Sequence, residues 1–404
     1  MNKKDLKVIM LGAGPLQVPA IKELKKMGIP VCCFDYDPNA EGFKYADEHK
    51  IISTVDVESI CKELIKETDF VLMTSTSDAP VRVISEVSEK LGIPCALSYR
   101  DACAVTIKSE MRKRLQEHHI AIPRFYVIDK WEKLKDVYRN FLKQYCIIKP
   151  TDSAGSRGVK LLEKGMQDEQ LKSEYEICKK NSKNGIIIAE EIMDGPEVSV
   201  ESLTINGHTD ILNITDKVVC SRPYFVEIGH VEPSRLSYDI KKQIENITIS
   251  AINAMNIKNG PSHTEIIVTE EGPKIVEIAA RLGGDYITSK LVPLSTGVNM
   301  VEKSIQIALQ QEVEYEIEKY DGAAIRFLGC DCEGTIKNIK GVDKALAVKG
   351  IYEVKIDARI GQKVKPLHSS NDRIGYIIAK GETAAQAWER VEKAYGYIQI
   401  EVAK

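Results

Sequence analysis

The chain has 404 residues, of which 43% are hydrophobic and 28% are charged, and its formal net charge is −3. This length exceeds one ordinary hydrophobic core and indicates about two to three domains of a globular protein. The near-neutral charge excludes a broad attraction to nucleic acid or to an anionic membrane, and no apolar run approaches the roughly 20 residues that span a bilayer.

The first hundred residues predict a doubly wound α/β unit that runs to about residue 104. The apolar runs at residues 8–11, 31–34 and 70–73 are typical of short buried strands. A helical apolar face follows the first run and ends at Gly28, a typical helix terminator. Alternation of strands and helices of this kind predicts a parallel sheet.

A glycine turn follows the first predicted strand and offers a dinucleotide-binding interpretation. Gly12, Gly14 and Asp35 match parts of that fingerprint, but its third glycine is replaced by Gln17. A glycine turn also closes any tight strand–helix unit. An NAD-dependent oxidoreductase therefore remains an alternative, which a nicotinamide titration would test.

Two lysines stand next to elements that could hold phosphate. Lys108 precedes a charged helical segment and, taken alone, is typical of a solvated surface charge. Lys149 ends a strand and leads into residues 150–159, a loop of small residues that contains Gly155 and Gly158. Backbone N–H groups of such a loop can approach anionic oxygens, and the lysine adds a positive charge. An ordinary flexible turn is the alternative.

A further strand at residues 185–189 continues through Glu190 and Glu191 to Met193. An extended segment offers backbone groups that can read the edge of an adenine, and Glu197 lies where it could accept from ribose hydroxyls. A buried strand followed by a turn is the alternative interpretation.

The next segment is rich in proline, glycine and ionisable residues, among them Glu227, His230 and Arg235. Such a loop suits recognition of a small charged substrate, although a solvated loop has a similar composition. His263 lies two residues before Glu265 and so shares its face of the predicted strand. It either orients the site or has a structural role.

Residues 264–279 predict a hairpin whose loop is residues 270–272, and this hairpin is the most informative feature of the chain. With that loop Glu265 lies opposite Glu277, where Cβ atoms are roughly 4.5–5.5 Å apart. Two carboxylates this close repel unless a cation lies between them, and Mg²⁺ prefers one or two carboxylates together with substrate phosphates. Arg281 continues the same face, so the pattern predicts a metal–phosphate site. An exposed hairpin with scattered charges is the alternative.

The last part of the chain predicts a small separate domain. A change near residues 320–322 is followed by short strands, including residues 375–379, and by a helix at residues 384–395. The ten cysteines of the chain are scattered without zinc-like spacing, which indicates free thiols in a reducing cytosol and hence a cytoplasmic location.

Taken in order, these segments resemble the ATP-grasp superfamily of carboxylate–amine ligases over nearly the whole chain. The resemblance rests on the order of Lys108, Lys149 with its glycine-rich loop, Glu190 to Glu197, Glu265, Glu277 and Arg281. Residues 225–234, 260–265 and 277–284 are most similar to the bacterial L-amino acid ligase branch. Biotin carboxylase and the carbamoyl-phosphate synthase large subunit are more distant relatives.

The resemblance implies a mixed α/β and α+β architecture in three parts. Residues 1–104 would form a Rossmann-like pre-ATP-grasp domain, residues 105–320 the two-lobed ATP-grasp domain, and residues 321–404 a small C-terminal α+β domain. Within the ATP-grasp domain, the smaller lid lobe would cover about 109–192 and the larger lobe about 193–320.

The resemblance also implies a role for each candidate residue. ATP would be bound by Lys108, Lys149, Ser153, Gly155, Ser156, Gly158, Glu190, Glu191, Met193 and Glu197. Mg²⁺, or Mn²⁺ in its place, would be held by Glu265 and Glu277. Catalysis would depend on Lys149, Glu277 and Arg281, the last of which would stabilise the phosphorylated intermediate. Substrate would contact Glu227, His230, His263, Arg281 and Gly283.

One position departs from the family pattern. Many ATP-grasp enzymes have asparagine two residues after the second metal glutamate, where this chain has Ala279. A methyl group cannot ligate a metal, so a second Mg²⁺ would need another ligand or water.

The implied activity is ATP-dependent amide formation through an acyl phosphate, with release of ADP and phosphate and with amino acids as the carboxylate and amine substrates. Two alternatives remain: an ATP-grasp enzyme that activates bicarbonate or another carboxylate, and a non-catalytic nucleotide-binding protein. No nucleic-acid or membrane partner is expected, and symmetry statistics favour a homodimer.

Overall fold

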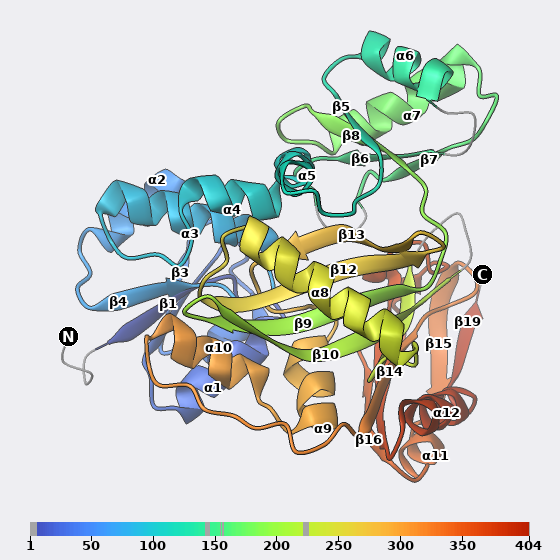
Figure 1. Cartoon of the computed structure of the whole chain (residues 1–404). Coiled ribbons are helices and arrows are strands. Elements are labelled where there is room, and N and C mark those ends of the chain that lie inside the picture. The colour runs from blue at the N-terminus through green and yellow to red at the C-terminus, as the bar shows by residue number, and fades with distance from the viewer. Residues whose placement is uncertain (1–5, 142–145, 154, 156, 221–225, 404) are drawn as a thin grey trace.

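The computed structural model describes residues 6–141, 146–153, 155, 157–220 and 226–403. Within these residues the strands form four sheets, of four, eight, three and four strands. One sheet is parallel and the others are antiparallel, which confirms the predicted combination of α/β and α+β structure. Figure 1 shows the eight-stranded sheet at the centre, with the parallel unit on one side and a small lobe standing off above.

The N-terminal unit is the predicted doubly wound sheet, in the strand order β3-β2-β1-β4. Its strands are β1 (Lys7–Leu11), β2 (Val31–Asp35), β3 (Glu48–Ile51) and β4 (Phe70–Met73). Its helices are α1 (Val18–Lys26), η1 (Glu41–Lys44), α2 (Val57–Leu64), α3 (Asp78–Leu91) and α4 (Tyr99–Thr106). The chain runs from β1 to β2 and β3 on one side and then crosses to β4 on the other side of β1, so the strand order reverses between β1 and β4. Open α/β sheets bind ligands at the carboxyl ends of the strands at such a point.

The lobe that stands off in Figure 1 is built on the antiparallel sheet β5-β8-β6-β7. Its elements, with the helix α5 that leads into it, are α5 (Lys108–Glu117), β5 (Phe125–Ile128), α6 (Trp131–Phe141), β6 (Cys146–Pro150), β7 (Lys160–Leu162), α7 (Asp168–Lys180) and β8 (Ile187–Glu191). The two helices α6 and α7 cover the sheet and enclose a small core of its own, with Leu134, Ile148 and Leu171 fully buried.

The central sheet has the order β13-β12-β9-β10-β11-β14-β18-β16. Its first five strands are β9 (Glu197–Ile205), β10 (His208–Val219), β11 (Glu227–Glu232), β12 (Gly260–Thr269) and β13 (Gly272–Ala279). The helices around them are α8 (Tyr238–Ala254), the π-helical turn η2 (Ile287–Leu291), α9 (Val292–Thr296) and α10 (Met300–Ala308). Helix α8 lies across one face of this sheet (Figure 1), and the opposite face carries the charged residues described below.

The C-terminal region continues the same sheet. Its elements are β14 (Gly322–Leu328), β15 (Gly334–Lys340), α11 (Val342–Leu346), β16 (Ile351–Ile356), β17 (Lys363–Val364), η3 (Ser370–Asp372), β18 (Gly375–Gly381), α12 (Ala384–Tyr395) and β19 (Gln399–Ala403). Strand β14 pairs with β11 on one edge and with β18 on the other. The three-stranded sheet β17-β15-β19 completes this region.

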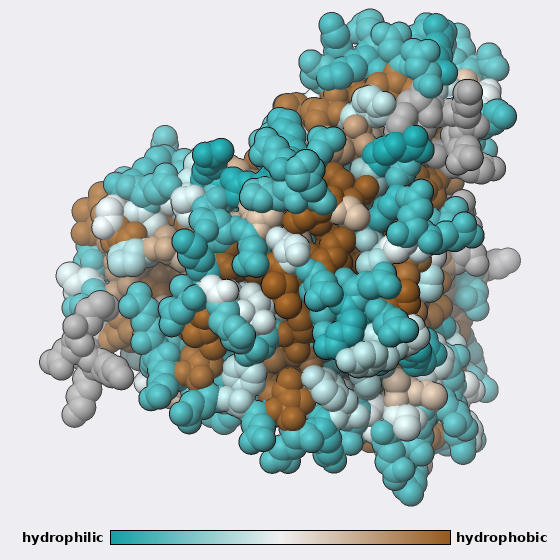
Figure 2. Space-filling model, viewed as in Figure 1, coloured by the Kyte–Doolittle hydropathy of each residue, from teal (hydrophilic) through white to brown (hydrophobic). Residues whose placement is uncertain are grey.

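One hydrophobic core joins parts that are far apart in sequence. Met10 of β1, Leu203 of β9 and Ile325 of β14 belong to the same buried cluster, as does Met300 of α10. The central sheet and the N-terminal unit are therefore packed on each other. Figure 2 shows a mostly hydrophilic surface in which apolar side chains form separate small areas.

None of the helices in the described ranges is long and apolar enough to span a membrane.

Candidate active site

The hairpin β12–β13 brings the two predicted metal carboxylates together. Glu265 lies directly opposite Glu277, as predicted. The reason differs from the prediction, because Thr269 pairs with Gly272 and the loop has two residues rather than three. The register instead shifts between Glu265 and Ile266, where one extra residue of β13 forms a bulge.

Each of these carboxylates faces a different lysine. Lys108 Nζ lies 2.9 Å from Glu277 Oε1, and Lys217 Nζ of β10 lies 3.3 Å from Glu265 Oε1. Burial alone would lower the pKa of both lysines, but their carboxylate neighbours outweigh it and raise that pKa. Both ammonium groups are therefore charged at neutral pH.

The carboxylate pair suits a hard divalent cation. In the described part of the chain no group of three or more His, Cys, Asp or Glu side chains is arranged around a common metal position. Glu265 and Glu277 alone offer opposed carboxylate oxygens, and Mg²⁺ typically takes one or two carboxylates and completes its shell with water and phosphate oxygens. The residues present thus fit Mg²⁺ held jointly with a nucleotide.

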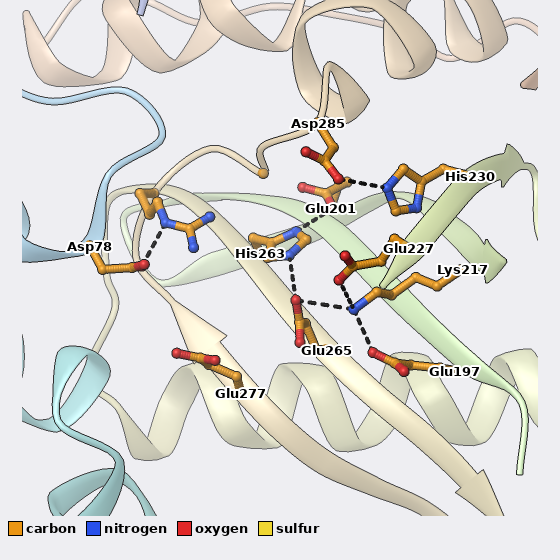
Figure 3. Close-up of polar contacts among 12 residues, drawn as sticks. Asp78, Glu197, Glu201, Lys217, Glu227, His230, His263, Glu265, Glu277 and Asp285 are labelled. Atoms are coloured by element: carbon orange, nitrogen blue, oxygen red, sulfur yellow. Dashed lines mark hydrogen bonds and ion pairs between the residues drawn. The ribbon is translucent and has the colours of Figure 1, made fainter. Parts of the chain in front are cut away.

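Lys217 is the centre of a larger acidic cluster (Figure 3). Its Nζ also contacts Glu197 Oε1 at 2.5 Å and Glu227 Oε1 at 3.4 Å. Burial opposes ionisation of Glu265, yet Lys217 and His263 outweigh it and hold the pKa of that carboxyl well below its usual range. One buried cation thus compensates three acids on neighbouring strands.

His263 connects the metal carboxylates to the interior of the sheet. Its Nδ1 lies 2.6 Å from Glu201 Oε1, and its Nε2 lies 3.5 Å from Glu265 Oε1. Burial alone would lower the pKa of His263, but the two carboxylates raise it to about 9. His263 is accordingly an imidazolium between two acids, not a neutral base.

The segment after β13 approaches this cluster closely. A Cβ atom placed on Gly283 would lie 2.7 Å from Glu201 Oε2 and 2.8 Å from His263 Nδ1. Arg281 turns toward the N-terminal unit and donates from Nε to Asp78 Oδ1 at 2.6 Å. The predicted catalytic arginine is therefore held by a carboxylate at the start of α3.

Lys149 lies on the lid lobe and is held by Glu190. Both oxygens of Glu190 are used, Oε2 by Lys149 at 2.9 Å and Oε1 by Arg112 Nε at 2.6 Å. Burial opposes ionisation of Glu190, but the two cations lower its pKa to about 2. Each oxygen of Glu190 thus has one cationic partner, and the predicted contact of Glu190 with the nucleotide stays a prediction.

The glycine-rich loop lies next to Lys108. The carbonyl of Ser153 accepts from Lys108 Nζ at 3.2 Å. Gly155 and Gly158 both have positive φ, 65° and 76°, and a Cβ at Gly158 would lie 2.5 Å from that of Asn181. Glycine is thus required at this second position for space as well as for conformation. Ser156, the other predicted contact in this loop, lies outside the described residues.

Ion pairs connect the end of β8 to the central sheet. Glu191 pairs with Arg124 at 2.6 Å and with Lys274 at 3.3 Å, which ties the lid lobe to β13. Met193 follows the strand and is half-buried. Glu197, at the start of β9, joins the Lys217 cluster.

Two of the three residues predicted in the segment before α8 reach the site. Glu227 contacts Lys217, and His230 Nε2 lies 3.2 Å from Asp285 Oδ2. Arg235 instead pairs with Asp216 at 2.7 Å and is half-exposed, away from the acidic cluster. Asp285 has a φ of 52°, an uncommon backbone conformation for a non-glycine residue.

A cavity of about 740 Å³ opens onto Lys108, Asp78 and Glu277. It extends along the carboxyl ends of the parallel strands, where Gly14 and Asp35 also line it. Asp152 and Ser153 of the glycine-rich loop line the same cavity, so it joins the N-terminal unit to the loop that would cover the phosphates.

The geometry of the glycine turn argues against the dinucleotide interpretation. Both oxygens of Asp35 accept backbone N–H groups, from Ala13 at 2.8 Å and Asp37 at 3.0 Å. The side chain of Gln17 is buried and lies over the turn, with Oε1 3.1 Å from a Cβ placed on Gly14. Ribose and pyrophosphate would have to displace both arrangements.

Several residues of the site were not predicted from the sequence. They are Asp78, Glu201, Lys217, Asp285 and Arg373. Lys217 carried only a weak signal, because it lies next to another charged residue, Asp216.

Two family models match separate parts of the chain. Residues 142–289 match the model of the ATP-grasp domain, and residues 326–403 match L-amino acid ligase C-terminal domain 2. The first match covers the glycine-rich loop and both metal carboxylates. The second begins within β14 and covers Arg373.

Full-length relatives carry two different activities. The L-arginine-specific L-amino acid ligase of Bacillus subtilis is 24% identical over 88% of this chain and 87% of that protein. The formate-dependent phosphoribosylglycinamide formyltransferase of Dechloromonas aromatica is 23% identical over 98% of this chain and 96% of that enzyme. The uncharacterised protein y4rH of Sinorhizobium fredii is 26% identical over 61% of this chain, which spans about half, 51%, of that relative.

Among solved structures, the L-amino acid ligase of Bacillus licheniformis has a TM-score of 0.84 at 20% identity, covering 98% of this chain and 99% of the other. The chain thus contains an ATP-grasp domain, and its match to this domain and to its relatives identifies an ATP-dependent ligase that forms carbon–nitrogen bonds. Its C-terminal residues 326–403 are similar to the corresponding domain of L-amino acid ligases.

Proposed function

We propose that this enzyme joins the carboxylate of an amino acid to an amine through an acyl phosphate. A carboxylate oxygen attacks the γ-phosphorus of ATP, the bond to the β-phosphate oxygen breaks, and ADP leaves. The amine nitrogen then attacks the acyl carbon, phosphate leaves, and the amine releases a proton. The observation that carries this proposal is the opposed pair Glu265 and Glu277, each with its own lysine.

The nucleotide would lie between the lid lobe and the central sheet. Lys108 and Lys149 would bind its phosphates, and the loop with Ser153, Gly155, Ser156 and Gly158 would cover them. The backbone near Glu191 and Met193 would read the adenine, and Glu197 the ribose. Mg²⁺ between Glu265 and Glu277 would neutralise charge on the β- and γ-phosphates.

The substrate carboxylate would lie between the metal site and the strand β11. Arg281 would stabilise the acyl phosphate; burial alone would lower the pKa of its guanidinium, but Asp78, and after it Glu277 and Glu265, raise that pKa. Glu227, His230, His263 and Gly283 would form the walls. Phosphoryl transfer needs mostly positioning and charge neutralisation, which these groups supply without a nucleophilic side chain.

Amino acids are the favoured substrates because the C-terminal match and the Bacillus relatives belong to amino acid ligases. A non-amino-acid carboxylate is the second candidate, favoured by the formate-dependent relative. A cytoplasmic location, a homodimer and the domain boundaries at residues 104 and 320 remain predictions.

The test is release of ADP and phosphate from Mg-ATP, screened against pools of L-amino acids, singly and in pairs. We expect release that requires amino acids, together with a new amide mass in the mixture. Release only with formate or other simple carboxylates would favour the second candidate. No release in any amino-acid pool, despite confirmed ATP binding, would contradict the amino-acid proposal and would favour a non-amino-acid carboxylate or a non-catalytic nucleotide-binding protein.

A further inference from the structure

The C-terminal region contributes one arginine to the acidic cluster of the central sheet. Arg373 lies between η3 and β18, and its side chain is only 9% exposed. Its NH1 donates to Asp285 Oδ2 at 2.8 Å. Its NH2 donates to the carbonyl of Glu227 at 2.8 Å and to Glu227 Oε2 at 3.2 Å. One guanidinium thus connects two acids that come from different elements of the ATP-grasp domain.

The guanidinium plane is held by an aromatic ring. Arg373 lies over Phe327 of β14, 3.8 Å from the ring centroid, and His230 meets the same ring edge-on at 5.7 Å. Stacking combined with two separate N–H contacts is available to a planar guanidinium and not to a lysine ammonium. These contacts therefore require an arginine at position 373.

The contacts of Arg373 determine where Glu227 points. Glu227 Oε1 lies 3.4 Å from Lys217 Nζ, while Oε2 faces Arg373 and, at 3.4 Å, Ser370 Oγ. Without Arg373 the carboxylate would lose one of its two cations. Lys217 would keep Glu197 and Glu265 as partners, so the nucleotide side of the cluster would keep its contacts.

Asp285 depends on the same guanidinium. Its carboxylate is held by Arg373 and His230, and its backbone has a left-handed φ of 52°, followed by another at Tyr286 of 61°. Conformations of this kind persist where surrounding contacts hold them. Arg373 of the C-terminal region therefore stabilises the turn that brings Gly283 into the site.

We propose that Arg373 is a positioning residue of the carboxylate-substrate site, fixing Glu227 and Asp285 so that the C-terminal domain controls affinity for the amino acid and not for ATP. The identity of the substrate rests on the proposed function. The positioning of Glu227 and Asp285 by Arg373 does not depend on the proposed function.

The chain provides a matched control in Arg326 of β14. This arginine also lies over an aromatic ring, Tyr395 at 4.4 Å, and also donates to a carbonyl of β11, Ile228 at 2.9 Å. Its ion pair is with Glu392 of α12, at 2.8 Å. Arg326→Lys therefore removes comparable contacts without touching Glu227 or Asp285.

The experiment measures ADP release by the full-length enzyme and its Arg373→Lys, Arg373→Gln and Arg326→Lys variants. The probe is an equimolar mixture of the twenty common L-amino acids, titrated at saturating Mg-ATP, and then ATP titrated at saturating mixture. We expect Arg373→Lys to raise the half-saturating amino-acid concentration about tenfold and to leave that of ATP within about twofold. Arg373→Gln should raise the half-saturating amino-acid concentration further. Arg326→Lys should change neither this value nor that for ATP. A parallel rise in both values, or the same effect from Arg326→Lys, would overturn the proposal.

Failure of the proposed function would be recognised separately. If the wild-type enzyme releases no ADP with the mixture, the amino-acid substrate class is wrong. Crystal structures of wild type and Arg373→Gln then decide the positioning: we expect the carboxylates of Glu227 and Asp285 to change position in the variant. Carboxylates that stay in place would show that Arg373 does not position them.

Discussion

Glu265 and Glu277 lie opposite each other, and each has a lysine from a different part of the chain. Lys108 comes from the start of α5 and Lys217 from β10, so closing the fold brings four alternating charges together. Each carboxylate is thus compensated by a lysine. A nucleotide-bound Mg²⁺ would share these oxygens, while the lysines would be free to bind phosphate.

Glu277→Gln should abolish ATP turnover and leave the fold intact. The amide keeps an acceptor oxygen for Lys108 but removes the negative charge that a divalent cation needs, so we expect a loss of at least about a hundredfold. ADP release and circular dichroism, measured on the same preparation, check the two halves of this prediction. Near-normal turnover in a folded variant would refute the metal assignment.

Two adjacent glycines should respond differently to the same substitution. Gly283→Ala places a methyl group against Glu201 and His263, which cannot withdraw without breaking their ion pair. We expect it to lower the free energy of unfolding by about 1–3 kcal/mol. A Cβ at Gly284 meets only Leu16 Cδ1, at 3.9 Å, so Gly284→Ala should stay within about 0.5 kcal/mol. Urea unfolding of the two variants checks this, and equal effects would contradict it.

At the scale of elements, the triad Arg112–Glu190–Lys149 joins α5 to two strands of the lid lobe. Arg112 also donates to the carbonyl of Val276 at 2.8 Å, so the triad reaches β13 as well. A buried carboxylate between two cations stabilises the fold only while it is ionised.

The triad predicts a specific loss of stability in acid. The pKa of Glu190 is about 2 in the folded protein against 4.5 for an ordinary glutamate, so its contribution is complete above about pH 4.5 and is lost as the pH falls toward 2. Urea unfolding of wild type and Glu190→Gln between pH 7 and pH 2 measures the contribution of Glu190 to the free energy of unfolding. We expect the variant to be less stable at pH 7 and the two curves to converge in acid. A constant difference across this range would show that Glu190 does not titrate as inferred.

The hairpin illustrates what the sequence could and could not predict. The pair Glu265 and Glu277 was predicted with a three-residue loop, whereas the structure has a two-residue loop and a bulge. A three-residue loop, and a two-residue loop with a bulge in β13, each add one residue between the paired positions. Both therefore place Glu265 opposite Glu277. Turn length and bulge position depend on packing against neighbouring strands, which no local pattern records.

Residues that reach the site from a distance were the least predictable. The sequence identified the strand-borne acids because their spacing is local. Asp78 and Arg373 act on residues 203 and 146 positions away in the chain. Arg373 lies in a polar segment with no periodic pattern, so its role appears only when β14 and β18 bring the C-terminal region beside β11.

At the scale of the whole molecule, the central sheet depends on the C-terminal strands. β14 covers the edge of β11, and Ala323, Ile325 and Phe327 belong to the core that also contains β1. A chain ended at residue 320 would expose that edge and lose part of the core. We expect it to aggregate or to lack a cooperative unfolding transition, as measured by size exclusion and circular dichroism.

A milder truncation provides the control for this prediction. A chain ended at residue 397 loses only β19, which pairs with β15 at the edge of the small sheet. It should remain monodisperse and bind ATP. A chain ended at residue 320 that folds and binds ATP would show that the ATP-grasp domain is independent of the C-terminal region.

Formation of an acyl phosphate is the central claim, and trapping with hydroxylamine tests it most directly. Hydroxylamine replaces the unknown amine and converts an amino-acyl phosphate to a hydroxamate, which mass spectrometry identifies. With Mg-ATP and the mixture of twenty L-amino acids, we predict hydroxamate in amounts equal to the ADP released, and none with Glu277→Gln. ADP release without hydroxamate, or hydroxamate accompanied by AMP instead of ADP, would contradict the account.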